Sequence, residues 1–302
     1  MENYVDISYG EETVPIGAEA CVVEALKEEG FKYSQVNLMT SASGLDPSEI
    51  CYDGCACIVL SCDDESCEET CHCLDKFGGN YVIVTSDDGT KKILLDIDDH
   101  VNGQPTPPIF ECNSMCKCSD QCINREVQRG VKVPLFVFQC DDDGRGFGVR
   151  TLEPLHKGQF ICEYAGDILD TSEAANRSSR QKFGDMNYVI GVREHTEEGS
   201  EVTFIDPQKR GNVGRFLNHS CDPNLIMIPV RCDSEIVRLA LFARRNIEAQ
   251  EELTFHYGGR PDEFKDNSCS KIQRKKCLCG SQNCEEFLPF DPSLFPHYAN
   301  GN

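Results

Sequence analysis

Clustered cysteine is the sequence feature that most constrains how this chain can fold. The 302 residues include 20 cysteines, and ten of these fall within two short groups. The first group consists of Cys55, Cys57, Cys62, Cys67, Cys71 and Cys73, and the second of Cys112, Cys116, Cys118 and Cys122. Thiolates spaced one or three residues apart can face one Zn²⁺ ion, which prefers four tetrahedral ligands. Because the second group is too short to bury a core of its own, metal binding is its natural source of stability.

A third group near the carboxyl end contains Cys277, Cys279 and Cys284, one thiolate fewer than a closed zinc site requires. Such a site either keeps an open position or takes a cysteine from elsewhere in the chain. We expect all three groups to bind metal through thiolates alone, because none of the seven histidines stands at ligand spacing.

Disulfide bonding is the alternative interpretation of these cysteines. The first ten residues have neither the basic start nor the apolar run of a signal peptide. We therefore expect a reducing compartment, where clustered cysteines bind metal more often than they form disulfides. A disulfide knot is the less favoured hypothesis.

The charge of the chain limits its partners. The sequence has 29 basic and 51 acidic residues, which gives a formal net charge of −22. Such a surface repels a polyanion, so we expect no direct sequence-specific DNA binding and favour a cationic partner. We also expect no membrane association, because no run approaches the 18 apolar residues that a spanning helix needs.

Short apolar runs separated by Gly, Asn and Pro predict a mainly β fold. The runs that indicate strands are 135–138, 160–164, 188–192 and 239–243, and 81–84 with 93–95 forms a hairpin around an Asp-Gly turn. A short helix should end at Gly30, and a second should be capped by Thr171 or Ser172. Residues 1–50 are acidic, and we expect them to form a docked or frayed arm without chemistry.

Three motifs in the β region carry a family resemblance. They are Gly144-Arg145-Gly146-Phe147-Gly148, the run from Arg215 to Asn224 that reads RFLNHSCDPN, and Glu251 to Gly258, which reads EELTFHYG. In this order, and flanked by these cysteine groups, they resemble the SET-domain lysine methyltransferases over about residues 50–290. The runs Phe110-Glu111-Cys112-Asn113 and Cys122-Ile123-Asn124-Arg125 resemble the Suv39-type enzymes in particular.

The resemblance implies a mainly β SET-domain fold of short β-sheets with a threaded C-terminal segment. A zinc-cluster pre-SET module would precede it, and a small zinc-bound post-SET tail would follow. The implied division is an acidic arm at 1–50, pre-SET at 51–129, the SET catalytic domain at 133–257, a connector at 258–272, post-SET at 273–289 and a tail at 290–302.

The same resemblance implies the number of metal ions. A pre-SET module of this family holds three zinc ions on nine cysteines, three of which bridge two ions. The two groups here offer ten, so Cys62 and Cys67 compete and one is spare. The fourth ligand of a single post-SET zinc would be Cys221, which would pin the tail against the active site.

The activity implied is transfer of a methyl group from S-adenosylmethionine to a lysine ε-amine. This amine must be neutral, which costs about 4 kcal/mol at neutral pH for a pKa near 10.4, and desolvation in a narrow apolar channel lowers that pKa. Tyr257 is the catalytic candidate whose hydroxyl orients the amine without acting as a base, and Tyr188 contributes to catalysis and cofactor binding. Phe255 leaves room for a di- or trimethyl product. The implied cofactor-binding residues are Arg145, Gly146, Phe147, Tyr188, Arg215, Asn218 and His219.

The resemblance further implies a histone substrate, most simply the basic tail of histone H3, bound as an added β-strand. Nucleosomes and chromatin would be the partners, the nucleus the compartment, and the protein a monomer. Two other functions stay open: methylation of non-histone proteins, and a weakly active zinc-stabilised module that binds chromatin.

The chain departs from the family pattern at two places. His256 stands where relatives usually have Asp. Residues 206–212 lack the tyrosines that commonly line the lysine channel, and we expect Lys209 and Arg210 there to add positive charge beside a cationic substrate unless they turn to solvent.

Overall fold

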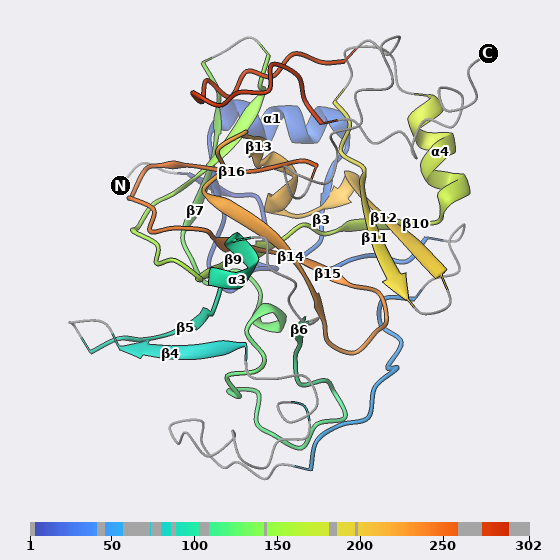
Figure 1. The fold of residues 1–302 in the computed structure, drawn as a ribbon. Helices are drawn as coiled ribbons and strands as arrows, with labels where there is room; N and C mark the ends of the chain where they lie inside the picture. Colours follow the sequence, from blue (N-terminus) through green and yellow to red (C-terminus); the bar gives the residue numbers. More distant parts are fainter. Residues whose placement is uncertain are drawn as a thin grey trace.

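The computed structural model describes residues 4–40, 46–56, 73, 80–85, 89–102, 109–141, 144–180, 186–196, 199–258 and 274–289 (Figure 1). Four predicted zinc ligands lie outside these ranges, namely Cys57, Cys62, Cys67 and Cys71. The same is true of most of the predicted connector, the final tail and the first part of the hairpin turn. Within the described residues, short strands dominate and confirm the predicted mainly β class.

The largest sheet has the order β1-β2-β7-β8-β16-β13. Its strands are β1 (Val5–Asp6), β2 (Gly17–Ala18), β7 (Leu135–Gln139), β8 (Phe147–Thr151), β16 (Glu252–Phe255) and β13 (Asn218–His219). The late strand β16 lies between two earlier ones, antiparallel to β8 and parallel to β13. A C-terminal strand is thus inserted within a sheet of earlier strands.

A second sheet has β12 (Gly199–Gly211) at its centre. β10 (Gly166–Leu169) and β11 (Ile190–Thr196) pair antiparallel with it, and β3 (Lys32–Tyr33) pairs parallel with its end. The strand predicted over 188–192 begins only at Ile190, so Tyr188 precedes it and is free of the strand's alternation.

Helix α4 (Thr171–Ser179) follows β10 directly. The predicted caps Thr171 and Ser172 are wrong, because both residues are already helical. Asp170 is the N-cap instead, and its carboxylate accepts a hydrogen bond from the backbone N–H of Glu173 at 2.7 Å. A carboxylate is well suited to this place, since it satisfies an otherwise unpaired N–H and interacts favourably with the helix dipole.

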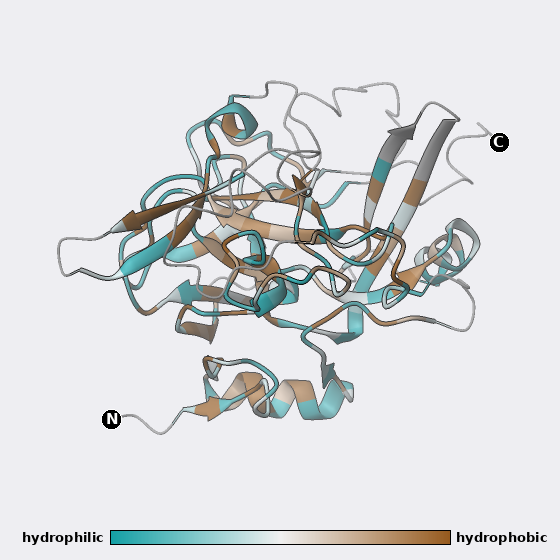
Figure 2. Cartoon of the chain, turned by 90° about the horizontal axis from the view of Figure 1, so that it is seen from below, coloured by the Kyte–Doolittle hydropathy of each residue, from teal (hydrophilic) through white to brown (hydrophobic). Residues whose placement is uncertain are grey.

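The third sheet has the order β6-β14-β15-β9. Its strands are β6 (Ile109–Phe110), β14 (Leu225–Arg231), β15 (Arg238–Ala243) and β9 (Phe160–Glu163). The predicted hairpin forms as β4 (Tyr81–Thr85) with β5 (Lys91–Leu95) and projects from the body, with its apolar first strand brown in Figure 2. The remaining elements are α3 (Asp98–Val101) and the 3-10 turns η2 (Val127–Arg129) and η3 (Val213–Phe216).

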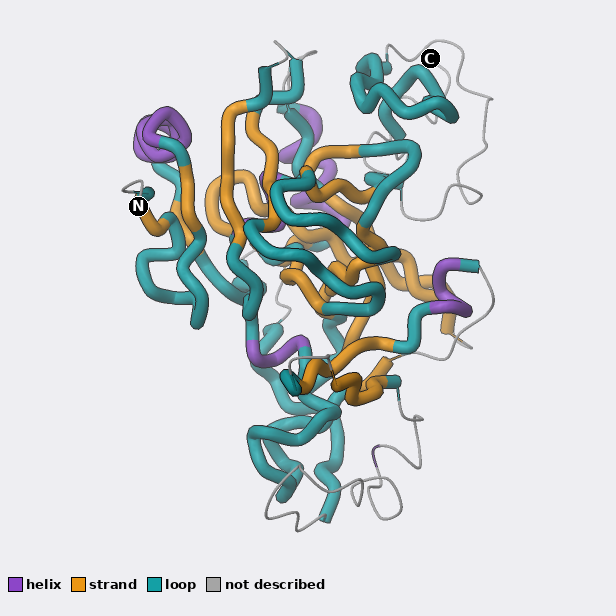
Figure 3. The backbone as a smooth tube through the Cα atoms, turned by 90° about the vertical axis from the view of Figure 1, so that its left-hand side faces the viewer, coloured by secondary structure: helices purple, strands orange, loops and turns teal. Residues whose placement is uncertain are grey.

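The amino-terminal segment, residues 4–40, is part of the core. Helix α1 (Ala20–Glu29) ends at Gly30, as predicted, where φ is +66°. The helix lies beside the strands of the main body (Figure 3) and buries Val22 and Leu26 in the central hydrophobic cluster. The arm is therefore docked through apolar burial.

A buried carboxylate fastens this segment. Glu12 is 5% exposed and accepts hydrogen bonds from the Tyr33 hydroxyl at 2.9 Å, the Gln35 amide at 3.0 Å and the Val131 backbone N–H at 3.1 Å. Because these donors come from residues 33, 35 and 131, Glu12 joins the segment to the chain that enters β7.

This docking predicts that Leu26→Ala lowers the free energy of unfolding by about 2 to 4 kcal/mol, since it leaves a cavity under α1. Urea unfolding of the zinc-loaded protein measures the change. Lys27→Ala, at the exposed neighbouring position, should alter it by less than about 0.5 kcal/mol. Equal small effects from both variants would contradict the docking of this segment in solution.

Candidate functional site

The ends of three neighbouring strands bring the motif residues together. Phe147 begins β8, Asn218 and His219 form β13, and Tyr257 follows two residues after the end of β16. Because β16 pairs with both β8 and β13, three motifs that are distant in the sequence meet at one place. Phe147, Asn218 and His219, which the resemblance implies for cofactor binding, therefore lie close together on neighbouring strands.

Asn218 is fixed by two acceptors. Its side-chain amide donates to the Phe147 carbonyl at 3.0 Å and to Oε1 of Glu252 at 2.9 Å, and Oε2 of Glu252 accepts from Nη1 of Arg145 at 2.9 Å. Sequence reasoning missed Glu252, although a carboxylate at the start of the strand that leads to Tyr257 was an available signal. Beside these residues, Gly146 has a φ of +70° and space where a Cβ would stand, which leaves its backbone open to a ligand.

Tyr257 is a partly buried phenol packed against the central hydrophobic cluster. Its hydroxyl donates to the Leu217 carbonyl at 2.9 Å, and its ring centroid lies 4.9 Å from that of Phe255. Burial raises the pKa of Tyr257 above its ordinary value, and the nearby Tyr188 hydroxyl raises it further. The side chain therefore stays protonated at neutral pH and cannot serve as a base.

A second buried tyrosine, Tyr164, belongs to the same site and was missed by sequence reasoning. Its hydroxyl donates to the Tyr188 carbonyl at 2.5 Å, and its ring lies 6.0 Å from Phe255. Burial raises the pKa of Tyr164 as well, with a smaller contribution from Tyr257. The signal was its position at the end of the predicted strand 160–164, where the hydroxyl of a buried tyrosine needs a partner.

His219 connects Tyr257 to the cysteines. Its Nδ1 accepts the backbone N–H of Tyr257 at 3.2 Å, and its Nε2 lies 3.3 Å from Sγ of Cys221. Burial, followed by the charge of His256, lowers the pKa of His219 to about 4. The ring is therefore neutral, with its proton on Nε2 facing the sulfur. His256, the departure from the family, packs edge-on at 4.8 Å between ring centroids.

Arg215 lies in an aromatic environment. Its guanidinium carbon is 4.6 Å from the ring centres of both Phe31 and Tyr188 and 5.0 Å from that of Phe216. Its Nη2 donates to Glu29 at 3.0 Å. Its Nε and Nη1 are buried and have no hydrogen-bond partner among the described residues. These donors suit a polar ligand, which fits the expected place of Arg215 beside a cofactor.

The two unusual cations of β12 are paired. Lys209 Nζ donates to the backbone carbonyl of Glu29 at 2.9 Å, and Arg210 reaches Asp167 through Nε at 2.7 Å and Nη2 at 2.6 Å. The charge of Arg210 is therefore compensated by Asp167, whereas Lys209 is exposed and binds a backbone carbonyl.

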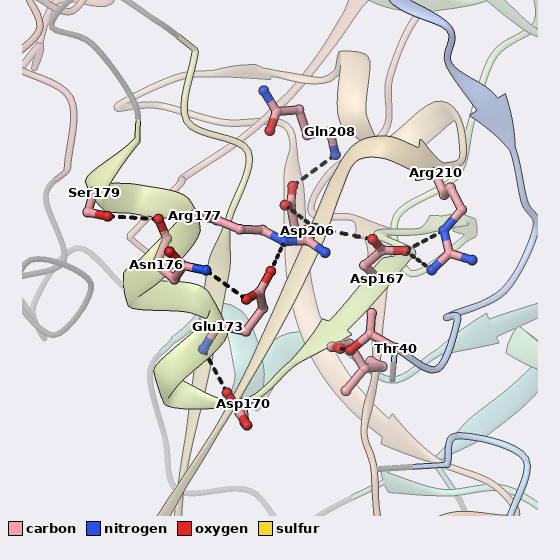
Figure 4. A network of polar contacts seen from close by, with 11 residues as sticks. Thr40, Asp167, Asp170, Glu173, Asn176, Arg177, Ser179, Asp206, Gln208 and Arg210 are labelled. Carbon is pink, nitrogen blue, oxygen red and sulfur yellow. Dashed lines mark hydrogen bonds and ion pairs between the residues drawn. The ribbon is translucent and has the colours of Figure 1, made fainter. Parts of the chain in front are cut away.

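Asp167 also belongs to a wider network at α4, drawn in Figure 4. Arg177 donates through Nη1 to Asp206 at 2.7 Å and to Asp167 at 3.1 Å, and through Nε to Glu173 at 3.0 Å. Asp206 is 1% exposed, so its carboxylate depends on Arg177 for compensation. The network joins α4 to β10 and β12.

The described cysteines of the first two sequence groups combine into two sets of sulfurs that share one member. The first contains Cys55, Cys73, Cys112 and Cys116, and the second contains Cys112, Cys118 and Cys122, with the sulfurs of each group within 4.8 Å of one another. Cys112 belongs to both, as a thiolate that bridges two ions would.

The surroundings of these sulfurs suit thiolates. Cys116 Sγ accepts backbone N–H bonds from Cys55 and Asn113, both at 3.2 Å, and Cys118 Sγ lies 3.5 Å from Nη2 of the buried Arg125. Donors of this kind stabilise negative sulfur, so the donor set fits Zn²⁺. No disulfide joins any of the fifteen cysteines that the structure describes.

The carboxyl-terminal group obtains its fourth sulfur from the active site. Cys221 lies within 4.8 Å of the sulfurs of Cys277, Cys279 and Cys284. Its Sγ also accepts the backbone N–H of Glu285 at 3.4 Å. The residues at 277–284 that carry these cysteines are thus held beside His219 and Tyr257.

No helix in the described part of the chain is long and apolar enough to cross a membrane.

Comparisons with known proteins agree with this arrangement. A family model described as SET domain matches residues 146–258, and one described as Pre-SET motif matches residues 8–125. The chain is 42% identical over 301 residues to histone-lysine N-methyltransferase SETMAR of Bos taurus. The aligned region covers 98% of this chain and 92% of that protein. The chain is also 35% identical over 265 residues to histone-lysine N-methyltransferase Su(var)3-9 of Drosophila pseudoobscura pseudoobscura, covering 86% and 39%.

Solved structures give the same result. The methyltransferase domain of human SETMAR matches with a TM-score of 0.75 and 38% identity over 96% of this chain and 99% of that one. KRYPTONITE in complex with mCHH DNA, an H3(1-15) peptide and SAH matches with a TM-score of 0.68 and 29% identity over 96% and 55%. The resemblance to Suv39-type enzymes, and among them to the methyltransferase half of SETMAR, is confirmed. With both domain models matched and relatives aligned along nearly its whole length, this chain belongs to the SET-domain histone-lysine N-methyltransferases of the SETMAR and Su(var)3-9 type.

Proposed function

We propose that this chain transfers methyl groups from S-adenosylmethionine to a lysine of the histone H3 tail and yields di- or trimethyl-lysine. The observation that carries the proposal is the group of buried aromatic residues around Tyr257, held against a four-thiol site by His219. The net charge of −22 attracts a basic tail, and KRYPTONITE, a structural relative, binds an H3(1-15) peptide. Chromatin in the nucleus is the corresponding setting, with the protein acting as a monomer.

The proposed cofactor residues have distinct tasks. S-adenosylmethionine, when bound, supplies an electrophilic methyl group. Hydrogen bonds to Phe147 and Glu252 hold the side-chain amide of Asn218 in one orientation, in which we propose that it contacts the cofactor. Arg145 and Gly146 offer backbone contacts, and Arg215 offers two buried donors. His219 and Tyr188 complete the set that we assign to cofactor binding.

Tyr257 is proposed to orient the acceptor amine. Because its hydroxyl proton is committed to the Leu217 carbonyl, the oxygen lone pairs remain free to accept an N–H from a neutral lysine. Tyr164 is committed to the Tyr188 carbonyl in the same way. Two fixed acceptors in an apolar site favour alignment of the amine, and burial there disfavours its charged form.

Tyr257→Phe should lower kcat/KM on histone H3 by about 100-fold, because the amine loses its fixed acceptor. Purified protein, labelled S-adenosylmethionine and a panel of core histones measure the effect. Equal background incorporation by both proteins on every histone would eliminate the histone-methyltransferase proposal. Incorporation into other proteins alone would favour the non-histone function, and binding to nucleosomes without incorporation would favour a chromatin-binding module.

Phe255 is proposed to set the number of methyl groups. It is 2% exposed and lies against both Tyr164 and Tyr257. Phe255→Tyr should shift the product toward monomethyl-lysine, since an added hydroxyl would hold the amine or a water where later methyl groups must fit. Mass spectrometry of the peptide at completion reads this out, and a wild-type product that stops at monomethyl would contradict the assignment.

We also propose three zinc ions in the pre-SET module (51–129) and one between the SET domain (133–257) and the post-SET segment (273–289). The shared position of Cys112 and the fourth ligand from Cys221 support this number. Residues 258–272 would be the connector and 290–302 the tail.

Metal analysis tests the zinc proposal. The wild-type protein should contain about four zinc ions per chain. Cys112→Ser should lose more than one ion, because the sulfur that it removes belongs to two groups. Cys232→Ser, at a buried cysteine outside these groups, should lose none. Zinc near zero in the wild type, or equal loss in both variants, would overturn the proposed cluster.

A further inference from the structure

We infer that Glu29 and Phe31 of the amino-terminal segment are positioning residues of the active site, which hold Arg215 against Tyr188. The inference rests on the proposed function, in which Tyr188 lines the site of cofactor binding and methyl transfer. It assigns a role to a segment for which the sequence predicted no chemistry.

Arg215 is the residue through which this segment acts. Its side chain is 2% exposed, and its guanidinium contacts Phe31 from the amino-terminal segment and Tyr188 from the segment before β11. A guanidinium held between aromatic groups fixes them relative to each other, because both contacts depend on the same planar cation. Phe31 is therefore coupled to Tyr188 although the two lie far apart in the sequence.

Glu29 sets the orientation of this guanidinium. Its Oε2 accepts from Nη2 of Arg215 at 3.0 Å, and no other carboxylate among the described residues forms an ion pair with Arg215. Nε and Nη1 already lack hydrogen-bond partners within the part of the chain that the structure describes. Removal of the Glu29 charge would leave a buried cation without compensation, which favours a different side-chain conformation. The ring of Tyr188 would then lose the group packed against it.

The position of Tyr188 depends strongly on this contact. Tyr188 precedes β11 and so lacks a strand partner, while its carbonyl accepts the hydroxyl of Tyr164 at 2.5 Å. A change in Arg215 is therefore transmitted first to Tyr188 and then to Tyr164, which contacts Phe255. The chain of contacts ends at the residues that we assign to the acceptor amine.

The amino-terminal segment is anchored firmly enough to act in this way. β3 pairs with β12 through Arg210 and Lys32, and the Phe31 backbone N–H donates to the Leu26 carbonyl at 3.0 Å. Lys209 binds the Glu29 carbonyl at the end of α1, where the helix dipole favours a cation. Lys209 thus fixes the backbone of the residue whose side chain orients Arg215.

Glu29→Gln, with Glu28→Gln as its matched control, tests the inference. Glu28 is exposed on the same helical turn, so its variant removes the same charge without touching Arg215. We expect Glu29→Gln to lower kcat/KM on an H3 peptide and affinity for S-adenosylhomocysteine by about 10-fold each, with an unfolding temperature close to that of the wild type. Glu29→Asp, which keeps the charge, should recover part of the loss, and Glu28→Gln should match the wild type.

Phe31→Leu, with Phe136→Leu as its control, tests the aromatic contact. Phe136 faces Arg150 at 4.9 Å, which is a similar pair outside the site. Both variants should lower stability, but only Phe31→Leu should weaken S-adenosylhomocysteine binding at a temperature where the protein is folded.

A readout independent of activity completes the design. In protein labelled with 3-fluorotyrosine, the ¹⁹F resonance of Tyr188, assigned with Tyr188→Phe, should shift in Glu29→Gln and stay unchanged in Glu28→Gln. Identical spectra and affinities for the two glutamine variants would overturn the positioning role. If the wild type methylates no substrate, the proposed function fails, while the Tyr188 resonance still decides whether Glu29 positions that residue.

Discussion

The pairing of β16 with both β8 and β13 is the constraint on which the active site depends. This late strand brings Tyr257 beside His219, whose Nδ1 accepts the tyrosine N–H, and places Glu252 where it holds Asn218 and Arg145. The site therefore exists only after the carboxyl-terminal part of the domain has entered the sheet. Such a non-local pairing costs loop entropy, which the buried aromatic contacts around Tyr257 help to offset.

The four cysteines around Cys221 extend the same constraint to the post-SET segment. Cys221 follows His219 by two residues, and the neutral imidazole lies within 3.3 Å of its sulfur. A zinc ion held by Cys221 and by the three post-SET cysteines, Cys277, Cys279 and Cys284, would fix the post-SET segment at the edge of the site. Folding of the post-SET segment and completion of the site are then coupled, because Cys221, which follows β13, belongs to both.

Short spacings predict the local parts of this arrangement, whereas the long-range contact of Cys221 with Cys277, Cys279 and Cys284 was expected only from the family resemblance. The cysteine groups, the hairpin, the Gly30 helix end and the motif around Asn218 each depend on residues a few positions apart. Tyr164 and Glu252 escaped prediction because their roles depend on partners far away in the chain. Asp170 escaped because Thr171, Ser172 and Asp170 are all good caps, and only the helix start decides between them.

Lys209 and Arg210 show why a departure from a family pattern must be judged with its partners. Isolated cations beside a lysine channel would repel the substrate ammonium, and the sequence alone gives no acceptor for them. In the structure, Arg210 is neutralised by Asp167, and Lys209 binds the end of α1 at Glu29. The carboxylate of the same glutamate forms an ion pair with Arg215. Lys209 and Arg215 are therefore both bound by Glu29 of the amino-terminal segment. The end of α1 thus contacts both β12 and Arg215 through a single residue.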